Sequence, residues 1–574
     1  MKNKSSNTRY PELAATLKDV RHYFIYAGLF SAAVNLLMLV PIIYMLQVYD
    51  RVVTSGSLAT LLMLTILAVA LLSASGAFEW VRSMILVSAS NRVELSLRDR
   101  VSRASFKYTL LSGGMGNGTQ PLSDLSALRQ FLTGNGLFAF FDAPWFPIYV
   151  AVMFMFHPWF GVAAILSGIV MVVLAYANEK MTSEKLQQAN TMAGSVMSRL
   201  GGSLRNAEVI AAMGMESDIR ARQNASSDKM LLLQSDASRS AGIMASVTKT
   251  FRVVMQSLLL GLGALLALKG EISPGMMIAG SLLLGRALAP IDMLVGTWRG
   301  FSVARVQYQR LGEMLTKIPE DAESMSLPAP AGELTAEQVV VVPPGANAAV
   351  VKGISLQVSP GQALGIVGPS ACGKSTLARA LLGIWPLYAG KVRLDGADIS
   401  TWNREELGPY IGYLPQDIEL FDGSIAENIC RFTEQDPAQI VAAAKMAGVH
   451  EMILHLPNGY DTVIGGAGGV LSGGQRQRIG LARAVYGNPR LLILDEPNSN
   501  LDDQGERELV EAIHRIKAAG ATVVIITHRT MVLNSVDKIL VMKEGQAVSF
   551  GPKDQVLASL MGTPQKPAIA SSGG

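Results

Sequence analysis

Six long apolar stretches fill most of the first half of the chain. They cover residues 23–48, 58–78, 137–156, 158–178, 251–268 and 275–295. A helix that crosses a bilayer needs about 20 mainly apolar residues, so this pattern predicts six membrane-spanning helices within a domain of residues 23–310. Pro144 and Pro147 lie inside the third stretch and predict a bend there, because proline cannot donate a helical hydrogen bond.

The polar segments between these stretches indicate the orientation. Turns near residues 157–158 and 269–274 are short, whereas the connections over 79–136 and 179–250 are long and mix charged with apolar residues. The first 310 residues hold 28 Lys or Arg against 17 Asp or Glu. Since basic residues remain on the cytoplasmic side, we expect both long connections in the cytoplasm, as helices that extend the spans. The N-terminal segment 1–22 is expected there too.

The basic excess lies beside apolar stretches, so it favours contact with a lipid bilayer, and no nucleic-acid partner is expected. Four polar residues nevertheless fall within or beside the spans: Asn35, Asp142, Arg286 and Asp292. Charges in a bilayer face protein or a water-filled path. Pairing between helices, or for Arg286 a side chain that extends to the membrane surface, is the favoured interpretation for each of them, and a polar lining for a polypeptide conduit is the alternative.

The pattern changes after the sixth stretch. Residues 311–332 end in the run Ser-Leu-Pro-Ala-Pro-Ala-Gly, which predicts a linker. Residues 333–560 alternate short apolar runs with helical patterns, which predicts an α/β domain. Residues 561–574 are rich in Pro, Ser and Gly and are expected to be disordered.

A glycine-rich loop follows the apolar run 363–367 and precedes a helical pattern that begins near Thr376. Its residues fit the phosphate-loop motif: Gly368, Pro369, Ser370, Ala371, Cys372, Gly373, Lys374 and Ser375. In a strand–loop–helix setting, backbone N–H groups surround phosphate oxygens. Lys374 would then add a cation for the β- and γ-phosphates, and the Ser375 hydroxyl would bind Mg²⁺. The expected cofactors are therefore ATP and Mg²⁺.

An acidic pair follows a second apolar run at 491–494. Asp495 is a candidate ligand of Mg²⁺, and Glu496 is a candidate general base that polarises the attacking water. A solvated turn is the alternative for any Asp-Glu pair, but a buried strand before it favours catalysis. A third apolar run, 523–526, leads to His528.

Together with these motifs, the run Leu471-Ser-Gly-Gly-Gln475 and the segments around Gln416 and 499–502 occur in a fixed order. The set resembles the ATPase module of ATP-binding-cassette (ABC) proteins. The resemblance implies a multidomain fold: an all-α transmembrane domain with six helices, of ABC exporter type, followed by an α/β P-loop ATPase domain. It also implies coupling helices near residues 112–124 and 206–214, for which an ordinary surface turn is the alternative.

The same resemblance implies roles for the remaining residues. His528 contacts the γ-phosphate, and Gln416 belongs to the catalytic and Mg²⁺-contacting groups. A signature sequence contacts ATP held by the partner protomer, and Asp502 belongs to a loop that crosses the same interface. The signature residues are Ser472, Gly473, Gly474 and Gln475. Because the chain has one phosphate loop and one signature, complete sites need two chains, so a homodimer is expected.

Two positions depart from the family pattern. Pro343 stands where an aromatic residue often stacks on adenine, and Gly466 stands where exporters often have an acidic residue before the signature. The first departure implies that stacking on adenine is weak or is supplied by another part of the chain. The second weakens an expected contact with the partner's coupling helix. Neither affects the phosphate chemistry.

Stretches of the membrane half resemble the inner-membrane ATPases of type I secretion systems, in the branch that exports proteases and lipases. They are residues 39–52, 285–292 and 298–300, with the entry to the ATPase domain at 341–345. The resemblance implies export of unfolded proteins, such as RTX-like proteins, with C-terminal secretion signals. It also implies a bacterial inner-membrane location, a membrane fusion (adaptor) protein and an outer-membrane channel of the TolC kind. Only about 22 residues precede the first span, too few for a peptidase domain, so unprocessed export is expected.

Two other functions fit part of this pattern. The first is an exporter of lipids or small amphiphilic molecules with the same fold, which would respond to amphiphiles and need no partner proteins. The second is an ATP-binding protein that does not transport, such as a regulator or a DNA-repair ATPase. Six spans and long cytoplasmic connections argue against the second.

Overall fold

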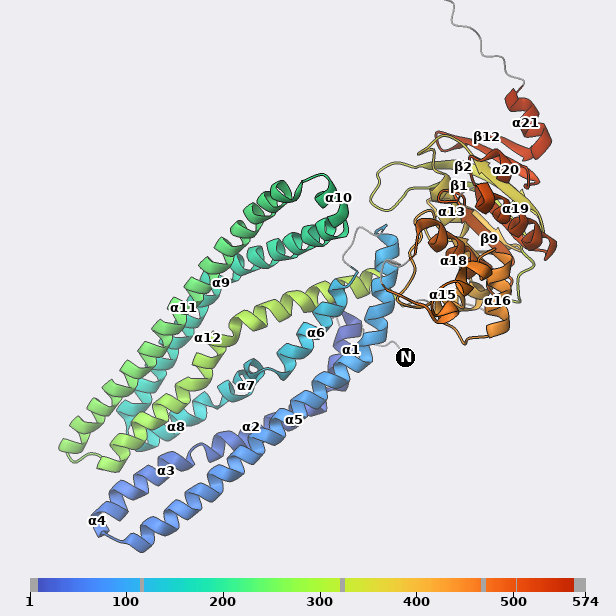
Figure 1. Ribbon diagram of the computed structural model, residues 1–574. Helices are drawn as coiled ribbons and strands as arrows, with labels where there is room; N and C mark the ends of the chain where they lie inside the picture. Colours follow the sequence, from blue (N-terminus) through green and yellow to red (C-terminus); the bar gives the residue numbers. More distant parts are fainter. Residues whose placement is uncertain (1–8, 114–117, 321–325, 466–470, 502, 562–574) are drawn as a thin grey trace, which may run out of the picture. The chain divides into compact units, whose positions relative to one another are not determined.

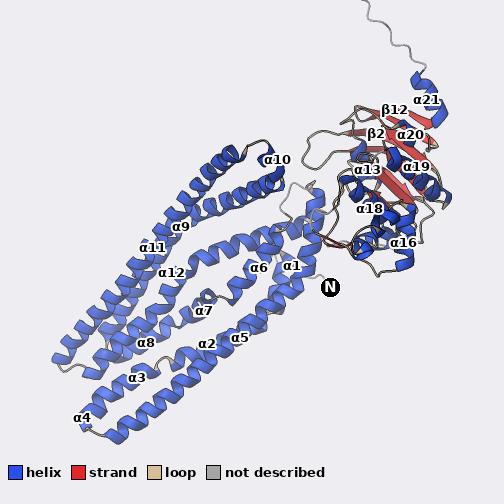
Figure 2. Cartoon of the chain, in the orientation of Figure 1, coloured by secondary structure: helices blue, strands red, loops and turns tan. Residues whose placement is uncertain are grey.

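The computed structural model describes residues 9–113, 118–320, 326–465, 471–501 and 503–561. The chain divides into two compact units, one formed mainly by residues up to Glu320 and the other by residues from Asp321 onward. Figure 1 follows the chain through both, and Figure 2 shows that one is helical and the other holds all the described strands.

The first unit consists of helices, several of them more than 40 residues long. They are α1 (Pro11–Asp19), α2 (Arg21–Leu37), α3 (Val40–Gln47), α4 (Val53–Ser55), α5 (Leu58–Leu111), α6 (Gln120–Thr133), α7 (Asn135–Asp142), α8 (Phe146–Phe156), α9 (Pro158–Arg205), α10 (Ala207–Ala212), α11 (Glu216–Leu268) and α12 (Pro274–Lys317). In Figure 1, α9 and α11 run side by side, with α10 at their tip.

Six helical segments of the described chain are long and apolar enough to cross a membrane, which confirms the predicted six-helix fold. They span residues 21–55, 58–111, 136–156, 158–205, 216–268 and 274–298. Helices α5, α9 and α11 continue well beyond their apolar parts, so the long polar connections do extend the spans as helices.

Two of the spans are interrupted. The first consists of α2, α3, a π-helical turn (Val48–Val52) and α4, with a break before Pro41 in the first turn of α3. The first predicted span, over residues 23–48, is therefore divided between two helices, since Pro41 has no N–H to continue the ladder. The third span is interrupted by a 3₁₀ turn (Ala143–Trp145) that contains Pro144, which confirms the predicted bend.

Helix α12 continues into the region predicted to be a linker. It ends at Lys317, so residues 311–317 are helical. Leu311, Met314 and Leu315 are buried in a cluster with Leu13 of α1 and Leu97 of α5. This packing extends the helix beyond the point where the apolar span ends, because burial of an amphipathic face stabilises helices more than sequence preference does.

Asn35, Asp142 and Asp292 pair with side chains of other helices, as the favoured interpretation predicted. The Asn35 side chain donates a hydrogen bond to Asp142 over 2.7 Å, and the Tyr149 hydroxyl donates to Asn35 over 2.9 Å. Arg82, which the sequence did not single out, completes the cluster with an ion pair to Asp142 at 3.0 Å. Its side chain is 3% exposed. A separate pair joins Asp292 to Arg252 at 3.4 Å.

Removing Arg82 is expected to destabilise the first unit strongly. In Arg82→Leu the Asp142 carboxylate loses its counter-ion in a largely buried place, and such losses cost about 3–5 kcal/mol. Thermal unfolding of the protein in detergent would measure the loss. The double variant Arg82→Leu/Asp142→Asn removes both charges and should recover most of it. Arg252→Leu, which breaks a more exposed pair, should cost less; equal losses from the two single variants would contradict this account.

The second unit contains two larger sheets and a two-stranded one. The strands are β1 (Leu334–Val341), β2 (Val351–Val358), β3 (Ala363–Val367), β4 (Ala389–Leu394), β5 (Ala397–Asp398), β6 (Ile411–Leu414), β7 (Gly423–Ser424), β8 (Val463–Ile464), β9 (Leu491–Asp495), β10 (Thr522–Ile526), β11 (Lys538–Lys543) and β12 (Gln546–Pro552). Its helices are α13 (Lys374–Leu381), α14 (Arg404–Leu407), α15 (Ile425–Ile429), α16 (Pro437–Met446), α17 (His450–Leu454), α18 (Gly473–Val485), α19 (Asp503–Ala518), α20 (Thr530–Leu533) and α21 (Lys553–Met561).

The main sheet has the order β12-β11-β3-β10-β9-β6, in which only β12 is antiparallel to its neighbour. A second, antiparallel sheet has the order β2-β1-β4-β5. Strand β9 is buried on both faces: Leu492 and Leu494 belong to one apolar core, and Leu491 and Ile493 to another. Burial on both faces explains why this strand is continuously apolar.

Candidate functional site

The candidate residues gather where four parallel strands end. Strands β3, β10, β9 and β6 are neighbours in the main sheet, and their carboxyl ends lie at one edge. The phosphate loop follows β3, the acidic pair closes β9, His528 follows β10, and Gln416 follows β6. Ligands of open α/β sheets bind at this edge.

The phosphate loop connects β3 to the first turn of α13. Pro369, Ser370 and Ala371 are exposed at its tip, whereas Cys372, Gly373 and Lys374 are buried beneath it. Ala371 and Gly373 have φ of +62° and +100°, left-handed conformations that curve the loop. A side chain on Gly368 would meet the Met542 carbonyl oxygen at 2.2 Å, so the motif's first position requires glycine.

Lys374 and Thr376 lie in the first turn of α13, whose free N–H groups make an anion site. The Lys374 ammonium donates to the carbonyl oxygens of Gly368 and Pro369, over 2.8 and 3.0 Å. These bonds fold the side chain over its own loop. The cation is therefore held at the place where the predicted phosphates would lie.

Asp495 is 1% exposed at the end of β9. Burial raises the pKa of its carboxyl group, while a hydrogen bond from Ser375 and the charges of Arg379 and Lys374 act in the opposite direction. Its Oδ1 atom is buried and has no hydrogen-bond partner among the described residues. An unpartnered carboxylate oxygen close to a serine hydroxyl fits Mg²⁺, which takes oxygen ligands and retains water.

Glu496 lies between two other candidates. The Gln416 amide donates to its carboxylate over 3.1 Å, and the His528 Nε2 atom lies 3.8 Å from it. The backbone of Glu496 is left-handed, with φ of +48°, and its N–H donates to the Ile526 carbonyl over 3.0 Å. Strained conformations of this kind collect at functional sites. The arrangement can hold a water molecule and accept its proton.

The signature begins helix α18. Ser472 is its N-cap, and Ser472 and Gln475 form a capping box by exchanging hydrogen bonds over 3.3 and 2.8 Å. Gly474 packs so closely on the Asn500 carbonyl that a side chain there would approach it to 2.8 Å. Gly473 is the first residue of the helix. Within the described chain, the side-chain hydrogen bonds of Ser472 and Gln475 close on each other rather than on the phosphate loop.

Three residues that the sequence singled out add nothing to the geometry of this site. Asp502 and Gly466 lie outside the described residues. Pro343 lies between β1 and β2 and is half-buried. One residue that the motifs did not indicate is Gln477, a buried amide on α18 that bonds to the segment following β9. Its sequence neighbours are Arg476 and Arg478, so the pattern of polar and apolar positions gives no signal for it.

Comparison with known proteins agrees with this geometry. Residues 351–499 match the family described as ABC transporter, and residues 24–289 match the ABC transporter transmembrane region. The chain is 46% identical to the type I secretion system ATP-binding protein PrsD of Rhizobium meliloti (strain 1021), over 97% of this chain and 96% of that protein.

More distant relatives and a solved structure match over nearly the same length. The leukotoxin export ATP-binding protein LtxB of Aggregatibacter actinomycetemcomitans is 28% identical over 94% of this chain and 76% of its own length. The toxin RTX-I translocation ATP-binding protein of Actinobacillus pleuropneumoniae is also 28% identical, over 94% of this chain and 77% of its own length. The structure of a bacterial Atm1-family ABC exporter with ATP bound superposes with a TM-score of 0.79, at 25% identity, covering 94% of this chain and 96% of that one.

Proposed function

The chain belongs to the ABC transporters of type I secretion systems, multi-pass membrane proteins that couple ATP to protein export, and we propose that its passenger is an unfolded polypeptide with a C-terminal secretion signal. The observation that supports this most is the 46% identity to a type I secretion ATP-binding protein over almost the whole length of both chains. Relatives that are named for leukotoxin export and for toxin translocation support a polypeptide passenger over a lipid or drug.

The proposed chemistry is hydrolysis of ATP at the edge of the main sheet. Lys374 and the first N–H groups of α13 bind the phosphates, and Ser375, Asp495 and Gln416 would hold Mg²⁺. The ion would neutralise charge on the phosphates. Glu496 accepts the proton of the attacking water, while Gln416 and His528 hold that carboxylate and the water in place.

We propose that the active form is a homodimer in which the signature of each protomer completes the site of the other. The signature residues are exposed or half-buried and unengaged by their own phosphate loop among the described residues. The α9–α11 hairpin supports the same assembly, because it leaves apolar residues exposed along both helices. They include Met197, Leu204, Leu231, Leu232 and Ile243.

In the same proposal the protein lies in a bacterial inner membrane with its ATPase domain in the cytoplasm. A membrane fusion protein and an outer-membrane channel of the TolC kind would continue the path to the outside. Membership in a type I secretion family supports both partners. The N-terminal and ATPase segments fall on one side, since an even number of spans returns the chain to the same compartment.

The test is the ATPase activity of the purified protein in lipid nanodiscs. We expect a C-terminal segment of a protein secreted by the same cell to change turnover at micromolar concentration, and a scrambled segment of the same composition to have no effect. Phospholipids and amphiphilic drugs are the comparison panel. A response to amphiphiles alone would replace polypeptide export with export of small molecules.

A further inference from the structure

A buried amide connects the signature helix to the candidate base. Gln477 is the fifth residue of α18 and is 2% exposed. Its Nε2 atom donates to the carbonyl oxygen of Glu496 over 3.2 Å and to the Ser499 hydroxyl over 3.4 Å. Its Oε1 atom accepts a hydrogen bond from the Asn500 N–H over 3.0 Å. Every polar atom of the amide is therefore used on the segment that follows β9.

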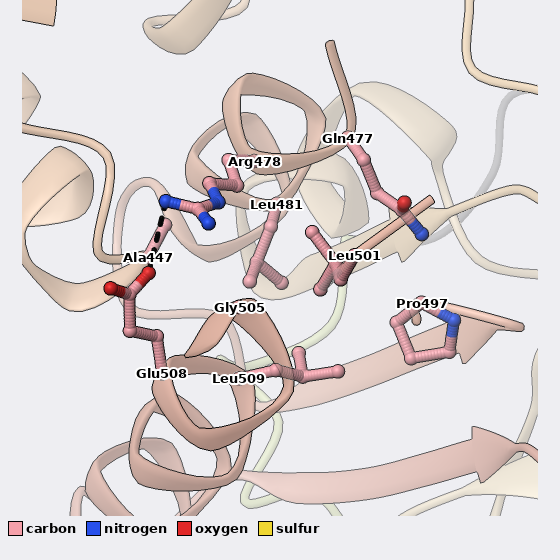
Figure 3. Close-up of a pocket in the computed structure, with 9 residues that line it drawn as sticks. All are labelled: Ala447, Gln477, Arg478, Leu481, Pro497, Leu501, Gly505, Glu508 and Leu509. Atoms are coloured by element: carbon pink, nitrogen blue, oxygen red, sulfur yellow. Dashed lines mark ion pairs between the residues drawn. The ribbon is translucent and has the colours of Figure 1, made fainter. Parts of the chain in front are cut away.

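Figure 3 shows how this side chain differs from its neighbour. Gln477 extends toward Pro497 and Leu501, on the far side of a small pocket from the ion pair between Arg478 and Glu508. The Arg478–Glu508 distance is 3.0 Å. Adjacent residues of one helix thus bind two different segments: Gln477 reaches the backbone of Glu496, and Arg478 pairs with Glu508 on α19.

The contact falls at a strained point of the chain. Glu496 adopts a left-handed backbone with φ of +48°, which a residue with a side chain retains only when its surroundings hold it. Its N–H donates to the Ile526 carbonyl, and its carbonyl oxygen accepts from both the Ser499 N–H and the Gln477 amide, each over 3.2 Å. The amide therefore supplies one of three hydrogen bonds that hold the backbone of Glu496, and the only one of the three that comes from a side chain.

The signature forms the N-terminal end of the same helix, about one turn before Gln477. Ser472 caps α18, and Gly474 packs against Asn500, the residue whose N–H Gln477 binds. The helix and the segment 499–500 are thus joined at two places less than two turns apart. When the first turn of α18 binds a phosphate, a shift of the helix would be transmitted to segment 499–500 through both contacts. Close-packed interiors are hard to compress and therefore transmit such shifts.

We propose that Gln477 is a positioning residue that sets Glu496 for hydrolysis when the signature helix engages ATP. The inference rests on the proposed function, in which the signature reads the nucleotide of the partner while Glu496 serves the nucleotide of its own protomer. Within one protomer, Gln477 therefore links the signature, which belongs to one composite site, to Glu496, which belongs to the other. The consequence is cooperative ATP hydrolysis that depends on this amide.

The experiment compares Gln477→Ala, Gln477→Glu and Arg478→Gln in the full-length protein, in nanodiscs and without any passenger. Gln477→Glu keeps the acceptor for Asn500 but loses the donor to Glu496. Arg478→Gln breaks the neighbouring ion pair and leaves the amide intact. The readouts are kcat, KM and the Hill coefficient for ATP, the affinity for a fluorescent ATP analogue, and the unfolding temperature.

Both Gln477 variants are expected to lower kcat about tenfold, the scale of a lost hydrogen bond at a reacting group. KM should change less than about twofold, and the Hill coefficient should fall toward 1, because binding is untouched while communication is lost. Arg478→Gln should retain the wild-type Hill coefficient. If Gln477→Ala unfolds, the kcat and Hill coefficient of the isosteric Gln477→Glu variant provide the test.

Two results would overturn the proposal: Gln477 variants that match Arg478→Gln in kcat, or variants with reduced kcat and an unchanged Hill coefficient. The second result would leave Gln477 with a structural role only. Since turnover is measured without passenger, a wild-type protein that hydrolyses ATP but ignores secretion signals would count against polypeptide export alone.

Discussion

Glu496→Gln is expected to bind ATP normally and to lower turnover about a thousandfold, within the range that general bases contribute. The amide keeps the shape of the side chain and can still accept the hydrogen bond from Gln416. It cannot accept a proton from water. The variant should therefore accumulate as an ATP-bound dimer, and export should stop. Single-turnover hydrolysis and retention of labelled ATP would measure the two effects separately.

The matched control is Glu511→Gln on α19. It makes the same change of charge in an exposed ion pair with Arg515, at 2.8 Å, and exposed pairs contribute little. Its turnover and ATP retention should equal those of the wild-type protein. Normal turnover in Glu496→Gln would remove Glu496 from the proposed role and direct attention to His528 as the group that accepts the proton.

The fold could be predicted from the sequence wherever a continuous apolar stretch shows that an element is buried in lipid or in a protein core. Six apolar stretches identify six helices because the length of a span depends only on the thickness of the bilayer. The apolar runs before Gly368 and at 491–494 indicate parallel strands because both faces of such a strand are buried. Neither inference needs knowledge of a distant contact.

Helix ends were less predictable, because tertiary packing sets them. Residues 311–317 look like the start of a linker in the sequence, yet Leu311 and Leu315 pack on α1 and α5 and carry α12 onward. The break in the first span was missed for a related reason. A run such as Leu-Met-Leu-Val is apolar whether it is straight or kinked, and only Pro41 indicates the turn before α3.

Polar contacts, too, were predictable only where the local sequence marks a residue, and not where its partner lies far along the chain. Asp142 was noticed because it stands in an apolar stretch, but its partner Arg82 lies 60 positions away, just beyond a predicted span, and resembles an ordinary flanking charge. Gln477 has no signal of its own, since it binds backbone atoms that any sequence would provide. Gln416, Glu496 and His528 were found by motif, and the strand order brings them together.

Mixed dimers should restore activity only when the two defects lie in different halves of the composite site. Lys374→Met removes the phosphate-binding cation, and Ser472→Arg blocks the signature with bulk and charge, so each variant alone should be nearly inactive. Co-expression with two affinity tags and purification through both isolates the heterodimer. One of its sites then combines an intact phosphate loop with an intact signature from the other chain, which predicts about half of wild-type turnover for independent sites.

The control pairs Lys374→Met with Glu496→Gln. Both residues serve the nucleotide of their own protomer in the proposed arrangement, so each site of this heterodimer retains one defect and turnover should stay at the level of the single variants. Recovery in the first pair but not in the second is the pattern that only sites shared between two chains produce. Coupling through Gln477 would lower the recovered turnover below half, and adding Gln477→Glu to the chain with the intact phosphate loop should reduce it further.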